Sequence, residues 1–148
     1  MPSVKPFVFS SRSKIRLEGV NADLVKVVHS ALERCPYDFM VVEGVRSMER
    51  QKQLYAQGRT APGPKVTWSM HSRHLTGHAV DLCPVDDDGV PMWAAKDRFL
   101  AIGKAMFEAA DEHKVLIRWG WDWDGDKNLQ EKGEYDGPHF ELVRTAYP

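Results

Sequence analysis

The 148-residue chain has only two cysteines, Cys35 and Cys83, which is too few for a disulfide-stapled scaffold. Two isolated cysteines favour buried, reduced thiols. No apolar run approaches the roughly 20 residues that a membrane-spanning helix needs. The N-terminal segment, residues 1–12, lacks the continuous apolar stretch of a secretory signal. We therefore expect a protein that is made in the cytoplasm and does not reside in a membrane.

An excess of charge of either sign is also missing. Twenty Lys and Arg residues face 21 Asp and Glu residues, and the formal net charge is -1. This balance gives no general electrostatic reason to expect a nucleic-acid partner. Hydrophobic residues make up 43% and charged residues 28%, as in an ordinary globular protein. Because there is no internal repeat, low-complexity tract or long linker, we expect residues 1–148 to form one domain.

Helix-like and strand-like segments alternate along the chain. Asn21 is a good helix cap ahead of an apolar stripe, and Ser47 is another. Three helices are expected, over about 21–34, 47–57 and 94–113, and strands over 39–45, 77–85, 115–119 and 138–143. This pattern predicts an α+β fold, with a small, mainly antiparallel sheet packed with about three helices.

Three histidines lie close together at His71, His74 and His78. Catalytic zinc sites use three nitrogen or oxygen ligands and keep a fourth position for water, and His74 and Asp81 are suitable for two of them. Because side chains alternate along a strand, His78 and Asp81 should point to opposite faces, which argues against His78 as a ligand. His139, in a later strand, is the best candidate for the third ligand.

Two further residues suit catalysis at such a centre. Asp136, three residues before His139, can reach the open side of a metal bound there, take a proton from metal-bound water and pass it to the leaving amine. Arg46, at the end of a predicted strand, can stabilise the oxyanion that forms at the scissile carbonyl. By composition alone, Arg46 is equally consistent with an exposed ion-pair residue.

Four segments, in order, carry a family resemblance. The stretch 72–81 resembles the SxHxxGxAxD motif of the zinc D-alanyl-D-alanine carboxypeptidase family, which includes phage L-alanyl-D-glutamate endopeptidases. The stretch 44–51 is similar to its GxRxxxxQ segment, and 136–141 to its DxPHFE segment. The stretch 119–123 is similar to the WGGDW run of the phage enzymes. Together these segments span about two thirds of the chain.

The resemblance implies one Zn²⁺ per chain, a fold shared with the hedgehog signalling domain, and specific roles for residues. His74, Asp81 and His139 would bind zinc, Asp136 would be the general base, and Arg46 would polarise the carbonyl. It also implies that Ser72 orients a ligand and that Gln51 belongs to the same functional segment.

The expected substrate is the peptidoglycan stem peptide, cut at the L-alanyl-D-glutamate bond by a monomeric endolysin. A chain without a secretion signal or wall-binding domain resembles phage enzymes that reach the periplasm once a membrane pore opens, and so lyse the cell. Trp121 departs from the phage pattern, which has glycine there, and its ring should reshape the cleft. Trp119 and Trp121 are suited either to stacking on substrate or to core packing.

Other functions stay open at this level. The chain is compatible with a D-alanyl-D-alanine carboxypeptidase, with a non-catalytic zinc-binding module, and with a Cys/His hydrolase that uses Cys83 or Cys35. The alternating run Asp122, Asp124, Asp126 partly resembles a calcium loop and suggests a regulatory Ca²⁺ site. Lys127 and Gly133 depart from the EF-hand pattern, however, which favours a solvated acidic loop.

Overall fold

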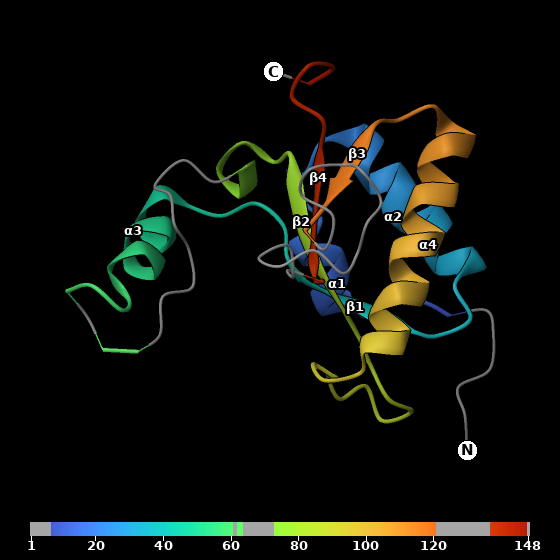
Figure 1. Cartoon of the computed structure of the whole chain (residues 1–148), viewed down its shortest axis with the longest axis horizontal. Coiled ribbons are helices and arrows are strands. Elements are labelled where there is room, and N and C mark those ends of the chain that lie inside the picture. Colours follow the sequence, from blue (N-terminus) through green and yellow to red (C-terminus); the bar gives the residue numbers. More distant parts are fainter. Residues whose placement is uncertain (1–6, 61, 64–72, 121–136, 148) are drawn as a thin grey trace.

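The computed structural model describes residues 7–60, 62–63, 73–120 and 137–147 (Figure 1). Four α-helices, one 3-10 helix (η1) and four strands form its regular structure. In chain order they are α1 (Ser11–Arg16), α2 (Ala22–Arg34), β1 (Phe39–Glu43), α3 (Met48–Ala56), η1 (Arg73–Thr76), β2 (Ala79–Pro84), α4 (Lys96–His113), β3 (Ile117–Trp119) and β4 (His139–Leu142). The predicted α+β class with an antiparallel sheet is confirmed.

The strands form one antiparallel sheet in the order β1-β2-β4-β3. Its register aligns three polar positions in one row, because Glu43 of β1 pairs with Asp81 of β2, and Asp81 pairs with His139 of β4. Adjacent to this row, Glu141 of β4 lies between Ala79 of β2 and Arg118 of β3. The two rows fall on the same face of the sheet, since side chains two residues apart on a strand share a face.

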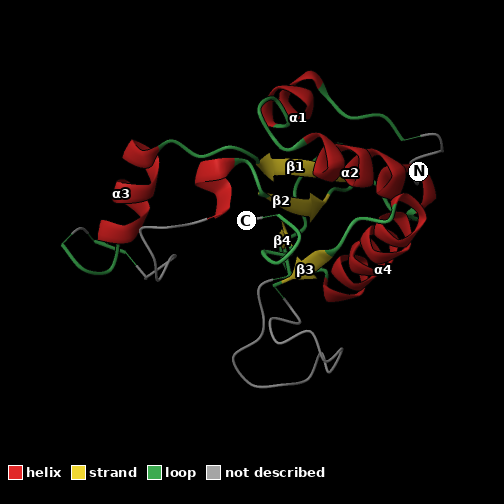
Figure 2. Cartoon of the chain, turned by 90° about the horizontal axis from the view of Figure 1, so that it is seen from above, coloured by secondary structure: helices red, strands yellow, loops and turns green. Residues whose placement is uncertain are grey.

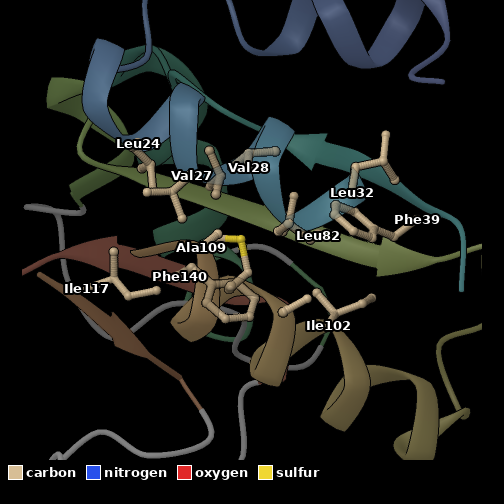
Figure 3. Packing of buried hydrophobic residues seen from close by; sticks show 14 of the residues in the cluster. Leu24, Val27, Val28, Leu32, Phe39, Leu82, Ile102, Ala109, Ile117 and Phe140 are labelled. Atoms are coloured by element: carbon tan, nitrogen blue, oxygen red, sulfur yellow. The ribbon is translucent and has the colours of Figure 1, made fainter. Parts of the chain in front are cut away.

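The opposite face is apolar and is covered by α2 and α4. Val80, Leu82, Phe140 and Leu142 alternate with the polar positions and are buried in the core. Figure 3 shows the side chains of both helices meeting those of the sheet, with Phe140 between them. The helical stripes are regular: α2 contributes Leu24, Val27, Val28, Ala31 and Leu32, and α4 contributes Phe99, Ile102, Met106 and Ala109. The sheet therefore has one face for packing and one face for chemistry.

Helix α1 lies along the outer edge of β1 and was not predicted. With six residues it is too short to show a helical period in the sequence. Its side chains bond the free edge of the strand: Ser13 Oγ accepts from the Val41 amide at 3.1 Å, and Arg16 donates to the Val41 carbonyl at 3.0 Å. Pairing of this kind protects an edge strand from other chains.

Helices α2 and α3 begin directly after the predicted caps. Asn21 accepts from the Asp23 amide at 2.9 Å, and Ser47 accepts from the Arg50 amide at 3.1 Å. Helix α3 lies to one side of the body formed by the sheet, α2 and α4 (Figure 2). No helix within the described ranges is long and apolar enough to cross a membrane.

Candidate metal centre and active site

His74, Asp81 and His139 come together at one point on the polar face of the sheet. They arrive from three elements, η1, β2 and β4, and one potential ligand atom from each lies within 4.8 Å of the other two. Asp81 Oδ1 is the shared contact: it lies 3.2 Å from His74 Nε2 and 3.1 Å from His139 Nδ1. The two rings meet edge to face, with centroids 5.1 Å apart. The structure therefore brings together the three residues predicted as metal ligands.

These distances suit a metal ion. Ligand atoms about 2.0–2.1 Å from a tetrahedral zinc ion are about 3.3 Å apart, close to both contacts that Asp81 makes. Two imidazoles and one carboxylate are a common donor set for catalytic zinc. The His74 side chain is almost fully buried, whereas that of Asp81 keeps 21% of its surface exposed. The arrangement of residues therefore fits a metal bound at the surface end of a buried cluster.

His74 is fixed by the segment that follows β1. Its Nδ1 lies 2.8 Å from the carbonyl oxygen of Gly44, and because a carbonyl only accepts, this nitrogen carries the proton. Its other ring nitrogen, Nε2, points toward Asp81 Oδ1 at 3.2 Å and is the one available to a metal. The His74 carbonyl accepts in turn from the Arg46 amide at 2.9 Å. Gly44 is required here, since a Cβ would stand 1.9 Å from the carbonyl oxygen of Arg16.

His139 presents its other nitrogen to the cluster. Its Nδ1 faces Asp81, and its Nε2 lies 3.0 Å from Glu141 Oε1, so Nε2–H donates to this carboxylate when Nδ1 binds a metal. The two histidines would thus coordinate through different ring nitrogens, each determined by the hydrogen bond on the far side of the ring.

Both carboxylates of the cluster are charged in this setting. Burial raises the pKa of Asp81, but the hydrogen bonds and charges of His139 and His74 outweigh it and hold the pKa well below the usual range. Burial likewise raises the pKa of Glu141, and the hydrogen bond from His139 and the charges of His139, Arg118 and Arg73 more than compensate, so its pKa is also lowered. Both groups are therefore held as carboxylates at neutral pH.

Arg46 is buried beside this centre and is not an exposed ion-pair residue. Its Nε and Nη2 donate to the two carboxylate oxygens of Glu43 at 2.8 and 2.6 Å, and its Nη1 donates to Gln51 Oε1 at 2.6 Å. Gln51 is completely buried. Three of the five guanidinium N–H groups are thereby used to hold the group in place, which is the rigidity that orientation of a reacting carbonyl requires.

Trp119 belongs to the core rather than to a substrate cleft. It stacks on Phe140 with ring centroids 5.6 Å apart, and its indole N–H donates to the Gly137 carbonyl at 2.8 Å. Only 3% of its surface is exposed, so stacking on a sugar or peptide is excluded for this ring. Its hydrogen bond instead anchors the chain two residues before His139.

The surroundings of the two cysteines argue against a Cys/His hydrolase. Cys35 and Cys83 are both buried, as predicted, and form no disulfide. Burial raises the pKa of the Cys83 thiol to about 11, and the thiol donates to the Pro84 carbonyl. Such a thiol is protonated at neutral pH and is a poor nucleophile.

Several predicted residues lie outside the described part of the chain. These are the proposed general base Asp136, Ser72, which was expected to orient a ligand, Trp121, and the possible calcium ligands Asp122, Asp124 and Asp126.

Comparison with known proteins identifies the chain's family. The family model for phage L-alanyl-D-glutamate peptidase matches residues 5–143. The chain belongs to this family. It is therefore a peptidase, and the family resemblance of the sequence motifs is confirmed. Membership of a peptidase family also argues against a non-catalytic zinc-binding module. The L-alanyl-D-glutamate peptidase of Escherichia phage T5 is 34% identical over 140 residues, which cover 93% of this chain and 98% of the relative.

Bacterial proteins are similar to the chain as well. The peptidoglycan L-alanyl-D-glutamate endopeptidase CwlK of Bacillus subtilis strain 168 is 33% identical over 127 residues, 83% of this chain and 70% of that protein. The solved structure of the Serratia marcescens L-Ala D-Glu endopeptidase ChiX is similar with a TM-score of 0.77 at 36% identity, covering 95% of this chain and 94% of that one. The vancomycin-resistance D,D-dipeptidase VanXYg shares the fold, with a TM-score of 0.52 at 21% identity over 84% of this chain and 50% of that one.

Sequence reasoning missed two residues of the site, Glu43 and Glu141. Neither differs by type from the many surface glutamates of the chain. The available signal for Glu141 is strand alternation, which puts it on the same face as His139, two residues earlier. The contact of Glu43 with Arg46 spans only three residues, but the register between β1 and β2 brings it next to Asp81.

Proposed function

We propose that the chain is a zinc-dependent peptidoglycan peptidase that hydrolyses the L-alanyl-D-glutamate bond of stem peptides. The observation that carries the proposal is the convergence of His74, Asp81 and His139, with ligand atoms within 4.8 Å of one another, in a member of this peptidase family. The three residues are the proposed zinc ligands. When bound, a zinc ion supplies a Lewis acid that makes water nucleophilic near neutral pH and polarises a carbonyl.

The protein side chains supply the remaining parts of the reaction. Arg46, fixed by Glu43 and Gln51, has two further N–H groups with which to bind the oxygen of the scissile carbonyl as negative charge develops on it. Asp136 is the proposed general base, which accepts a proton from the attacking water and returns it to the leaving amino group. The support for Asp136 is its place in the family motif, one residue before Gly137, whose carbonyl is held by Trp119.

The choice of bond follows the relatives with high coverage. The names of the phage T5, Bacillus and Serratia proteins all specify a peptidase for the bond between L-alanine and D-glutamate. We propose further that the chain acts as a monomeric, single-domain endolysin that reaches the wall after the membrane has been permeabilised.

The test of the reaction is mass spectrometry of fragments released from purified peptidoglycan. New fragments that begin with D-glutamate are expected, and release of free D-alanine instead would refute the proposed bond. His139→Ala should abolish the release and the bound zinc together. His78→Ala is the matched control and should leave both intact, because His78 contacts Thr76 outside the cluster.

Asp136→Ala separates chemistry from metal binding. Loss of a general base lowers rates by about 10²–10⁴-fold, so fragment release should fall by this factor while the zinc content stays at one per chain. Unchanged release would remove Asp136 from the mechanism.

A further inference from the structure

Glu141 is a buried carboxylate with no part in the reaction proposed above. Its side chain is 7% exposed, and burial of a charged group is unfavourable unless the group is paired and hydrogen-bonded. Its Oε1 lies 3.0 Å from His139 Nε2, on the side of the ring opposite Asp81. The carboxylate therefore contacts a candidate metal ligand without belonging to the candidate metal-binding set.

The second carboxylate oxygen lies between two arginines. Glu141 Oε2 is 3.9 Å from Arg73 Nε and 4.0 Å from Arg118 Nη1. Arg118 is its cross-strand neighbour on β3, whereas Arg73 immediately precedes His74 in η1. Arg73 is itself anchored, because Nη2 donates to the carbonyls of Leu142 and Tyr147 at 3.2 and 2.6 Å.

These contacts close a ring around the centre. From His139 the ring runs through Glu141 to Arg73, along the chain to His74, and through Asp81 back to His139. The element that carries one histidine is thereby tied to the strand that carries the other. A shift of η1 relative to β4 would change the Arg73–Glu141 contact together with the His74–Asp81 contact.

We propose that Glu141 is a positioning residue for the metal centre: by accepting a hydrogen bond from His139 Nε2–H, it leaves the Nδ1 lone pair directed at the ion. This inference rests on the proposed function, since it requires a metal bound by His74, Asp81 and His139. Outer-shell partners of this kind change metal affinity by about 10–100-fold when they are removed. A purely structural ion pair with the arginines would leave the affinity unchanged.

Two substitutions separate these roles. Glu141→Gln keeps an oxygen that can accept from His139 but removes the charge that faces Arg73 and Arg118. Glu141→Ala removes both. Glu108→Ala, on the exposed side of α4, is the control for loss of a carboxylate. Folding of the full-length variants is compared by melting in the presence of a chelator, so that metal binding does not enter the comparison.

Zinc affinity is measured by competition with a chromophoric chelator. Wild type and Glu108→Ala should bind one zinc per chain with the same affinity. Glu141→Ala should bind about 10–100-fold more weakly, and Glu141→Gln should recover most of this loss. If wild type binds no zinc, the proposed function fails. If wild type binds zinc and Glu141→Ala binds it equally well, only the positioning role of Glu141 is overturned.

A spectroscopic measurement tests the orientation directly. Imidazole ¹H–¹⁵N correlation spectra of the zinc-loaded protein should show His139 coordinated through Nδ1, with a slowly exchanging Nε2 proton. The proton signal should persist in Glu141→Gln and be lost to exchange in Glu141→Ala. The same protected signal in Glu141→Ala, or coordination of wild-type His139 through Nε2, would contradict the proposal.

Discussion

Removal of the Glu43 carboxylate should separate the stability role of the Glu43–Arg46 pair from its catalytic role. Arg46 is 8% exposed and Glu43 26% exposed, and two charge-assisted bonds of 2.8 and 2.6 Å join them. Glu43→Ala leaves the guanidinium buried with only Gln51 as a described side-chain partner. Loss of one partner from a fully buried pair lowers the free energy of unfolding by about 3–5 kcal/mol. Because water reaches Glu43, we expect about 2–4 kcal/mol.

The double variant Glu43→Ala/Arg46→Met provides the decisive comparison. It contains no unpaired buried charge, so its loss of unfolding free energy should be smaller than the sum of the two single losses by about 1–3 kcal/mol. Activity should not recover with stability. Glu43→Ala releases the orientation of Arg46 and should lower turnover about 10²-fold, and the double variant lacks the guanidinium altogether.

Urea denaturation with chelator present measures the stabilities, and release of soluble stem-peptide fragments measures the activity. Additive losses of unfolding free energy in the double variant would show that the pair is not coupled. Wild-type turnover in Arg46→Met would refute the proposed role of the guanidinium at the carbonyl, whatever the stabilities are.

Three further predictions follow from the site and its supports. Chelation should abolish peptidoglycan cleavage and lower the melting temperature, and added zinc should restore both. A metal ion at 100 times its dissociation constant stabilises the folded protein by about 2.7 kcal/mol, so a melting temperature unchanged by chelator would contradict the metal site. Iodoacetamide at neutral pH should leave Cys83 unmodified in the folded enzyme, because burial raises the pKa of its thiol to about 11. The same reagent should modify Cys83 in denaturant, and rapid labelling of Cys83 in the native protein would contradict the prediction. Gly44→Ala should lower the free energy of unfolding by about 3 kcal/mol or more and weaken zinc binding, since its Cβ would clash with the backbone of Arg16 and displace the carbonyl that holds His74. The control Gly89→Ala, at a positive φ but with no atom within 4 Å of the added Cβ, should lower it by about 1 kcal/mol. Equal losses of unfolding free energy at the two sites would reject the packing argument.

Much of the fold and the candidate ligand set could be predicted because the signals are local. The caps Asn21 and Ser47 and the apolar stripes of α2 and α4 each lie within one contiguous segment. Strand alternation separates Phe140 and Leu142, which are in the core, from His139 and Glu141, since the period of two is a property of the strand itself. The proposed ligands stood out because each belongs to a short motif of characteristic spacing.

What tertiary structure alone decided are the partners of those ligands. The pairing of β1, β2 and β4 placed Glu43, Asp81 and His139 in one row, and no residue spacing encodes a register between strands that are about 40–60 residues apart. Helix α1 exists where it does because the edge of β1 offers it hydrogen bonds. The sequence by itself therefore determined which residues could bind a metal, while the association of distant segments determined which nitrogen of each histidine faces the site, because that choice depends on contacts with Gly44 and Glu141.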